Sequence, residues 1–143
     1  METGYIKIKE NERHEFVVEA KLVNGTIWLT KHEIANLFNV FVNTIGNNLR
    51  SIFKSRLLLE EEVTHSHKYK HNGRELEMVL YNLEIVIFVS YRISSFETKA
   101  FREWVLKSFS QFINNETNKQ SNVLIIFNSK SEQIGRASCR ERV

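Results

Sequence analysis

The sequence contains no proline and no aspartate, and it has one cysteine among 143 residues. Because every carboxylate side chain is a glutamate, metal or triad chemistry that depends on aspartate is excluded. A single cysteine excludes an internal disulfide framework and offers no metal-ligand spacing. No run reaches the roughly 18 apolar residues of a membrane span, and the N-terminus lacks a signal-peptide core. We therefore expect a soluble, cytoplasmic protein that contacts no membrane.

The composition predicts one folded domain followed by a different C-terminal region. Hydrophobic residues make up 42% of the chain, enough for a real core, and we place the domain at residues 1–113. Residues 114–132 are rich in Asn, Ser, Thr and Lys, and this composition predicts a flexible tail. Residues 133–143 resemble a translated sequencing-library adapter and are treated as not native. Leaving them out removes three arginines and Glu141 and lowers the formal charge from +3 to +1, so global charge does not indicate nucleic acid.

Residues 30–53 predict two short amphipathic helices joined at Asn39. In the first helix, which Thr30 can N-cap, Ile34, Leu37 and Phe38 recur at spacings of three and four. In the second helix, residues 42–53, the same spacing continues through Ile45, Leu49, Ile52 and Phe53. The pattern is typical of a helix-turn-helix, although any helical hairpin in a core shows the same stripe.

The opposite face of the second helix carries short hydrogen-bonding side chains suited to a DNA major groove. We predict that four residues contact bases: Asn43, Thr44, Asn47 and Asn48. We predict that six residues contact phosphates: Lys31, Arg50, Lys54, Lys68, Lys70 and Arg74. Phe41, just before this helix, is expected to pack rather than to be exposed.

Two Asn-Gly pairs predict β-hairpins. Around Asn24-Gly25, residues 16–23 are expected to pair with residues 26–29, which places Trp28 in the core. Around Asn72-Gly73, residues 63–70 are expected to pair with residues 74–81. This second hairpin follows the helix pair as a wing would, and its outward residues are expected to lie along a phosphate backbone: His65, His67, Lys68, Lys70, His71 and Arg74.

Two further helices complete the expected α+β fold, a winged helix-turn-helix-like domain. Asn82 can N-cap residues 83–91, whose apolar run requires a central position. Ser95 can N-cap residues 96–112. The aromatic stripe of this last helix predicts either core or a homodimer seam and includes Phe96, Phe101, Trp104 and Phe112.

With these elements placed, the chain resembles the virulence RhuM family and the related phage antirepressor-type N-terminal domains of the BRO and KilA type. Four stretches carry the resemblance over residues 26–109: TIWLTKHEIANLF, SIFKS, LYNLEIVIFVSYRISS and FREWVLKSF. The resemblance implies a DNA-binding protein, a transcriptional regulator linked to mobile elements or prophages, with double-stranded DNA as partner and no enzymatic activity, cofactor or small-molecule substrate.

Two alternatives remain open at the level of the sequence. Residues 60–62 with His65 and His67 can be drawn as a metal site, but they lack the closed ligand set that zinc needs. The other alternative is a protein-interaction or dimerisation module in which the helix pair is scaffold only. It predicts no salt-sensitive DNA binding, whereas a DNA-binding dimer does.

Overall fold

The computed structural model describes residues 3–119, and within them the chain has a mixed α+β fold with five helices and two small antiparallel sheets. The chain divides into two compact units, Met1–Trp104 and Val105–Val143, so the first unit ends before the predicted domain boundary at 113. No helix in the described part of the chain is long and apolar enough to cross a membrane. The helices and the two antiparallel sheets confirm the α+β class predicted from the sequence.

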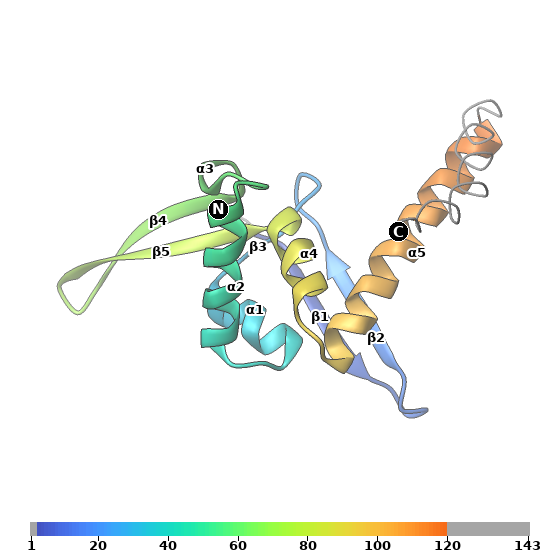
Figure 1. Cartoon of the computed structure of the whole chain (residues 1–143), viewed down its shortest axis with the longest axis horizontal. Helices are drawn as coiled ribbons and strands as arrows, with labels where there is room; N and C mark the ends of the chain where they lie inside the picture. The colour runs from blue at the N-terminus through green and yellow to red at the C-terminus, as the bar shows by residue number, and fades with distance from the viewer. Residues whose placement is uncertain (1–2, 120–143) are drawn as a thin grey trace, which may run out of the picture. The chain divides into compact units, whose positions relative to one another are not determined.

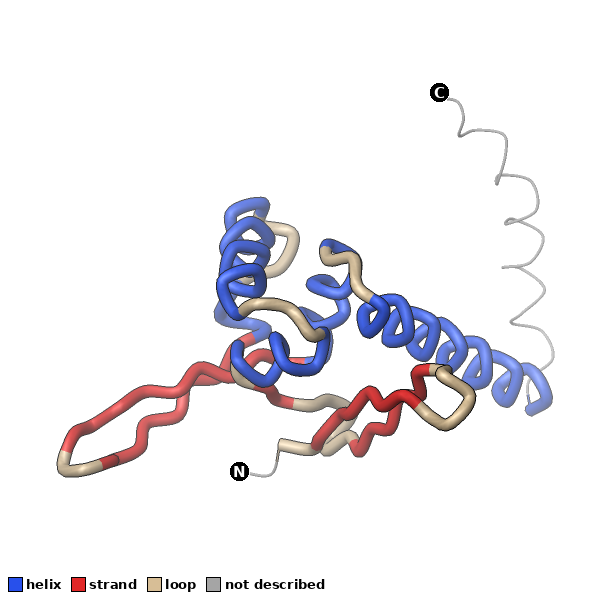
Figure 2. The backbone as a smooth tube through the Cα atoms, turned by 90° about the horizontal axis from the view of Figure 1, so that it is seen from below, coloured by secondary structure: helices blue, strands red, loops and turns tan. Residues whose placement is uncertain are grey.

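The elements follow one another in the order that Figure 1 shows, with helices and strands distinguished in Figure 2. Their bounds are β1 (Tyr5–Glu10), β2 (Phe16–Lys21), β3 (Trp28–Leu29), α1 (Lys31–Phe38), α2 (Val42–Ser55), α3 (Glu60–Val63), β4 (Thr64–His71), β5 (Arg74–Asn82), α4 (Leu83–Arg92) and α5 (Phe96–Lys119). One sheet consists of β1 and β2, and the other has the strand order β3-β5-β4.

The α1–α2 pair forms where the sequence predicts it. Thr30 Oγ1 accepts a hydrogen bond from the Glu33 amide at 3.1 Å, and the Glu33 carboxylate accepts one from the Thr30 amide at 2.8 Å. This reciprocal capping box satisfies two otherwise unpaired amides and fixes the start of α1. Asn39 ends the helix in the left-handed conformation (φ 55°), which asparagine tolerates better than most residues.

The N-terminal strand pairing differs from the prediction. The turn at Asn24-Gly25 forms, with both residues at positive φ and Val23 bridged to Thr26, but the pairing stops there. β2 instead pairs over six residues with β1, and β3 pairs with β5. The longer ladder with β1 satisfies more backbone groups than a pairing with the two-residue β3 would.

The prediction that Trp28 is a core anchor is wrong. Ile27 and Leu29 are buried, so in an extended chain Trp28 points to the opposite face. There it is half-buried and makes an edge contact with the His65 ring at 6.0 Å between centroids.

The predicted second hairpin is confirmed as β4 and β5. Asn72 and Gly73 both have positive φ (52° and 77°), as a two-residue type I′ turn requires, and His71 pairs with Arg74. Figures 1 and 2 show the hairpin projecting from the α1–α2 pair. α3 lies at its base, where burial raises the pKa of Tyr81 above its usual range and the charge of Glu60 raises it further.

α4 is the central helix of the first unit, as its apolar sequence predicts. Asn82 Oδ1 accepts a hydrogen bond from the Ile85 amide at 3.2 Å and caps the helix. Ile85, Val86 and Val89 are fully buried. The core around them includes Ile27, Ile34, Phe38, Ile45, Val63 and Phe101.

The aromatic residues of the stripe predicted on α5 differ in burial and in the residues that they contact. Phe101 is 0% exposed and meets Phe38 edge to face at 5.4 Å, and Trp104 lies 5.7 Å from Phe101. Phe96 stacks on Phe16 at 6.1 Å yet is 76% exposed, and Phe112, in the second unit, is 59% exposed. Of the four stripe residues only Phe101 belongs to the core, and Trp104 is half-buried beside it.

α5 also continues beyond the predicted end at residue 112. Its last residue is Lys119, so residues 114–119 of the predicted flexible tail are helical. The rest of that tail, 120–132, and the adapter-like residues 133–143 lie outside the described residues.

Gly4 allows a close backbone approach between the start of β1 and the end of β2. Its φ is +71°, and a Cβ there would lie 2.4 Å from the Lys21 carbonyl oxygen. We expect Gly4→Ala to lower the free energy of unfolding by more than the roughly 1–2 kcal/mol of a left-handed L-residue alone. Gly25→Ala is the matched control because Gly25 also has positive φ (+79°) but nothing lies within 4 Å of its Cβ position. Equal losses for the two variants in urea denaturation would contradict the clash.

Candidate nucleic-acid interface

α2 presents one buried and one polar face. Ile45, Leu49 and Ile52 are buried against the core of the first unit, and Phe53 is half-buried beside them. The solvent-facing side carries Asn43, Asn47, Arg50, Ser51 and Lys54, which are all exposed, with Thr44 half-buried at its margin. The predicted base-contacting residues Asn43, Thr44 and Asn47 thus lie on one accessible helix face.

Phe41 stands at the N-terminal end of this face. The prediction that it packs is wrong, because 84% of its surface is exposed. It occupies the N-cap position of α2, where it makes no side-chain capping bond. An apolar ring therefore borders the polar side chains of the first turn.

Lys31 and Arg50, predicted from the sequence as phosphate contacts, converge on Gly46. A Cβ built at Gly46 would lie 3.7 Å from Lys31 Nζ and 3.8 Å from Arg50 Nη1, which places both cationic groups over the same glycine. Arg50 Nη2 also donates to Asn47 Oδ1, which directs the guanidinium along the polar face. Two cations from two helices thus share one edge of α2.

No carboxylate offsets these charges locally. Among the residues that the structure describes, the one salt-bridge contact joins Glu10 to His14, which is charged only when protonated, at 3.1 Å in the β1–β2 turn region. Glu33, the acidic residue of α1, has its carboxylate bonded to the Thr30 amide. The positive charge at Gly46 is therefore available to an external anion.

Asn48 differs from the other predicted base-contacting residues. Its Nδ2 donates to the Thr44 carbonyl at 2.8 Å, and its Oδ1 accepts from Arg92 Nε at 2.9 Å. Each polar atom of the amide thus has one partner within the protein, which leaves one N–H and one oxygen lone pair without a partner in the described part of the chain. The bond to Arg92 ties α2 to α4, and the base contact predicted for Asn48 stays a prediction.

The sequence reasoning missed Arg92 and Ser51. Arg92, the last residue of α4, also donates from Nη2 to Ser51 Oγ at 2.8 Å. The contact joins residues 41 positions apart, and no local pattern signals it. Only the packing of α4 against α2 brings this cation to the polar face.

The register of the β4–β5 hairpin corrects the expected basic stripe. Lys68 pairs with Glu77, and Lys70 pairs with Glu75. Because directly opposed residues share a face, each lysine has a carboxylate beside it. Successive residues alternate between faces, so the lysines lie on one face and the histidines on the other. The histidine face carries His65, His67, Tyr69 and His71, with Arg74 opposite His71 beside the turn.

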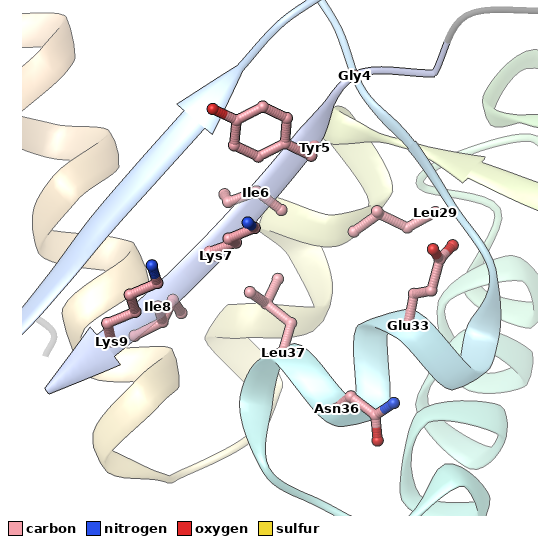
Figure 3. Close-up of a pocket in the computed structure, with 10 residues that line it drawn as sticks. All are labelled: Gly4, Tyr5, Ile6, Lys7, Ile8, Lys9, Leu29, Glu33, Asn36 and Leu37. Carbon is pink, nitrogen blue, oxygen red and sulfur yellow. The ribbon is translucent and has the colours of Figure 1, made fainter.

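An open groove of about 500 Å³ lies between β1 and α1, away from the polar face of α2. Figure 3 shows its walls, which are formed mainly by Ile6, Ile8, Leu29 and Leu37, with Lys7 and Lys9 along β1. No group of three or more metal-ligating side chains is brought together in the described part of the chain. His65 and His67 are thus not joined by the glutamates of residues 60–62.

No protein-family model matches this chain, and no curated protein or solved structure matches it either.

Gly46 lies in the middle of α2 without a conformational need for glycine. Its Cβ position meets only the flexible ends of Lys31 and Arg50, at ordinary contact distances of 3.7–3.8 Å. We expect Gly46→Ala to raise the free energy of unfolding by about 1 kcal/mol, because alanine is the better helix former. Thermal unfolding followed by circular dichroism measures this. Gly73→Ala, at φ +77° in the hairpin turn, is the control and should lower stability; a loss for Gly46→Ala would contradict the open geometry.

Proposed function

We propose that this protein is a double-stranded DNA-binding protein of the winged helix-turn-helix kind, in which α2 enters the major groove and the β4–β5 hairpin is the wing. The observation that carries the proposal is the polar face of α2, edged by the Lys31 and Arg50 cations at Gly46 with no described carboxylate partner. Holding two like charges together is unfavourable without an anion. The phosphate backbone of DNA supplies such anions at regular spacing.

In this proposal, residues in the first two turns of α2 contact the bases. Asn43 and Asn47 are exposed, and asparagine can bind an adenine edge through two hydrogen bonds. Recognition helices commonly contact bases through their N-terminal residues, which favours Asn43, Thr44 and the exposed Phe41. A phenylalanine at this place can contact a thymine methyl group.

In this proposal the β4–β5 hairpin helps to position the protein on DNA and adds little net positive charge. Lys68 and Lys70 lie opposite Glu77 and Glu75, so these four side chains together carry no net charge. Arg74, opposite His71 at the turn, remains the wing cation without a carboxylate opposite it. In the proposal Arg74 contacts the backbone, while the two lysines add little.

The resemblance to the RhuM and antirepressor-type domains supports the same function. It extends the proposal to a cytoplasmic transcriptional regulator linked to mobile elements or prophages, acting without enzymatic activity. We further propose that it acts as a homodimer, since many helix-turn-helix proteins bind paired half-sites.

A protein-interaction module is the second candidate. In the second unit α5 exposes Leu106, Phe109 and Phe112, and large exposed apolar side chains mark interaction surfaces when they are contiguous. Under this alternative α2 is scaffold, and the protein forms a complex without binding DNA.

Selection from a pool of random-sequence duplexes at about 50 and about 200 mM salt tests the proposal. We expect binding that weakens steeply as salt rises. Asn43→Ala with Asn47→Ala should reduce the difference in affinity between selected and unselected sequences. Lys31→Gln with Arg50→Gln should weaken all sequences alike and lower the salt slope by about 0.9 per lost phosphate contact.

Lys21→Gln is the charge control for Lys31→Gln and Arg50→Gln taken singly, because it removes one positive charge and Lys21 is exposed on β2, in the other sheet. It should leave both affinity and salt slope unchanged. Absence of salt-dependent binding by the unaltered protein, together with self-association in sedimentation experiments, would favour the interaction module instead.

A further inference from the structure

Arg92 reaches the polar face of α2 from a different helix. Its Nε donates to Asn48 Oδ1 at 2.9 Å and its Nη2 donates to Ser51 Oγ at 2.8 Å, while the side chain remains exposed. A guanidinium group carries five N–H donors, so these two hydrogen bonds leave donors for another partner. Within the described residues no carboxylate forms an ion pair with Arg92.

The segment that carries Arg92 is held firmly. Arg102 Nη1 donates to the Ser90 carbonyl at 2.5 Å, and its guanidinium lies over the Tyr91 ring at 5.7 Å. Beyond the helix end, Thr98 Oγ1 donates to the Ile93 carbonyl at 2.9 Å. These contacts hold the chain on both sides of Arg92, and the bonds to Asn48 and Ser51 orient its guanidinium, which lowers the entropy lost when it binds a ligand.

The positions around α2 place Arg92 across the polar face from the Lys31–Arg50 pair. Each helical residue advances by about 100°, so Gly46 and Ser51 lie roughly 140° apart around the axis. Asn43 and Asn47 fall between them on the exposed arc. Cations therefore stand at both edges of this face, and Lys54 lies between them, two turns beyond Asn47.

We infer that Arg92 contacts a DNA phosphate on the wall of the major groove opposite the one contacted by Lys31 and Arg50. The inference rests on the proposed function and adds a residue from α4 to it. The major groove is about 12 Å wide and has a phosphate strand along each side, so a helix lying in it meets phosphates at both edges. Asn48 and Ser51 then act as positioning residues, because they orient the guanidinium and do not contact bases.

A purely structural brace between α2 and α4 is the competing explanation, and the two differ in their response to salt. Binding of the full chain to a short fluorescein-labelled duplex of mixed sequence is measured by anisotropy between about 50 and about 200 mM salt. With Arg92→Gln, we expect the loss of affinity over this range to be about threefold smaller than for the unaltered protein, as one lost phosphate contact predicts. Arg92→Lys should retain the original slope, because lysine keeps the charge.

Arg13→Gln is the matched control, since Arg13 is exposed in the β1–β2 turn and its loss changes the formal charge equally. It should not alter the slope. The double variant Asn48→Ala with Ser51→Ala removes the two acceptors but keeps Arg92; it should lower the affinity at each salt concentration, because the guanidinium is no longer oriented, and retain the slope, because the charge remains.

An unchanged slope for Arg92→Gln, with the unaltered protein still binding in a salt-dependent manner, would overturn the role of Arg92 and leave the proposed function standing. A shallower slope for Arg92→Lys and for the Asn48/Ser51 double variant as well would overturn it in favour of the brace. Absence of salt-dependent binding by the unaltered protein would instead overturn the proposed function together with this inference.

Discussion

Burial of α4 is the constraint on which the rest of the first unit depends. Its run from Ile85 to Val89 is apolar on every side, and an apolar helix is stable in water only when other elements cover it. α2 packs on one side, β5 leads directly into it, and the return of the chain through Ser95 brings Phe101 onto Phe38. The same packing brings the C-terminal end of α4 to the polar face of α2. The packing that buries α4 therefore also sets the position of Arg92, which no local sequence pattern predicts.

For the attraction of an external anion, the positions of the charged side chains matter more than the net charge of the protein. The formal charge is modest, and on the β4–β5 hairpin each of Lys68 and Lys70 lies opposite a glutamate. Neither these lysines nor the cations around α2 form an ion pair within the described residues, but only on the hairpin does the register place a glutamate opposite each lysine. Charges offset across a strand pair add little to an external field, whereas unpaired charges at the edges of one helix face attract anions strongly.

Local signals in the sequence predicted most of the elements. Asn72-Gly73 specifies a type I′ turn, Thr30 and Asn82 carry capping side-chain oxygens, and Asn39 tolerates positive φ, so each fixes a boundary through contacts within a few residues. The register of the hairpin also follows from the two-residue turn, and the pairing of Lys70 with Glu75 was predictable although it was missed. The alternation of Ile6 and Ile8 with Lys7 and Lys9 was an equally available signal for β1.

The helix pair, its buried face, the projecting hairpin and the central helix could thus be predicted from the sequence, because they depend on contacts within a few residues or on periodicity. The strand pairing, the face that Trp28 occupies and the hydrogen-bond partners of Asn48 could be read only from the folded chain. Those outcomes depend on competition between segments far apart in the chain. β1 can pair with β2 over more residues than β3 can, and Arg92 donates a hydrogen bond to the Asn48 amide oxygen. Such competition is settled by the free energy of the whole packed unit and leaves no trace in a local pattern.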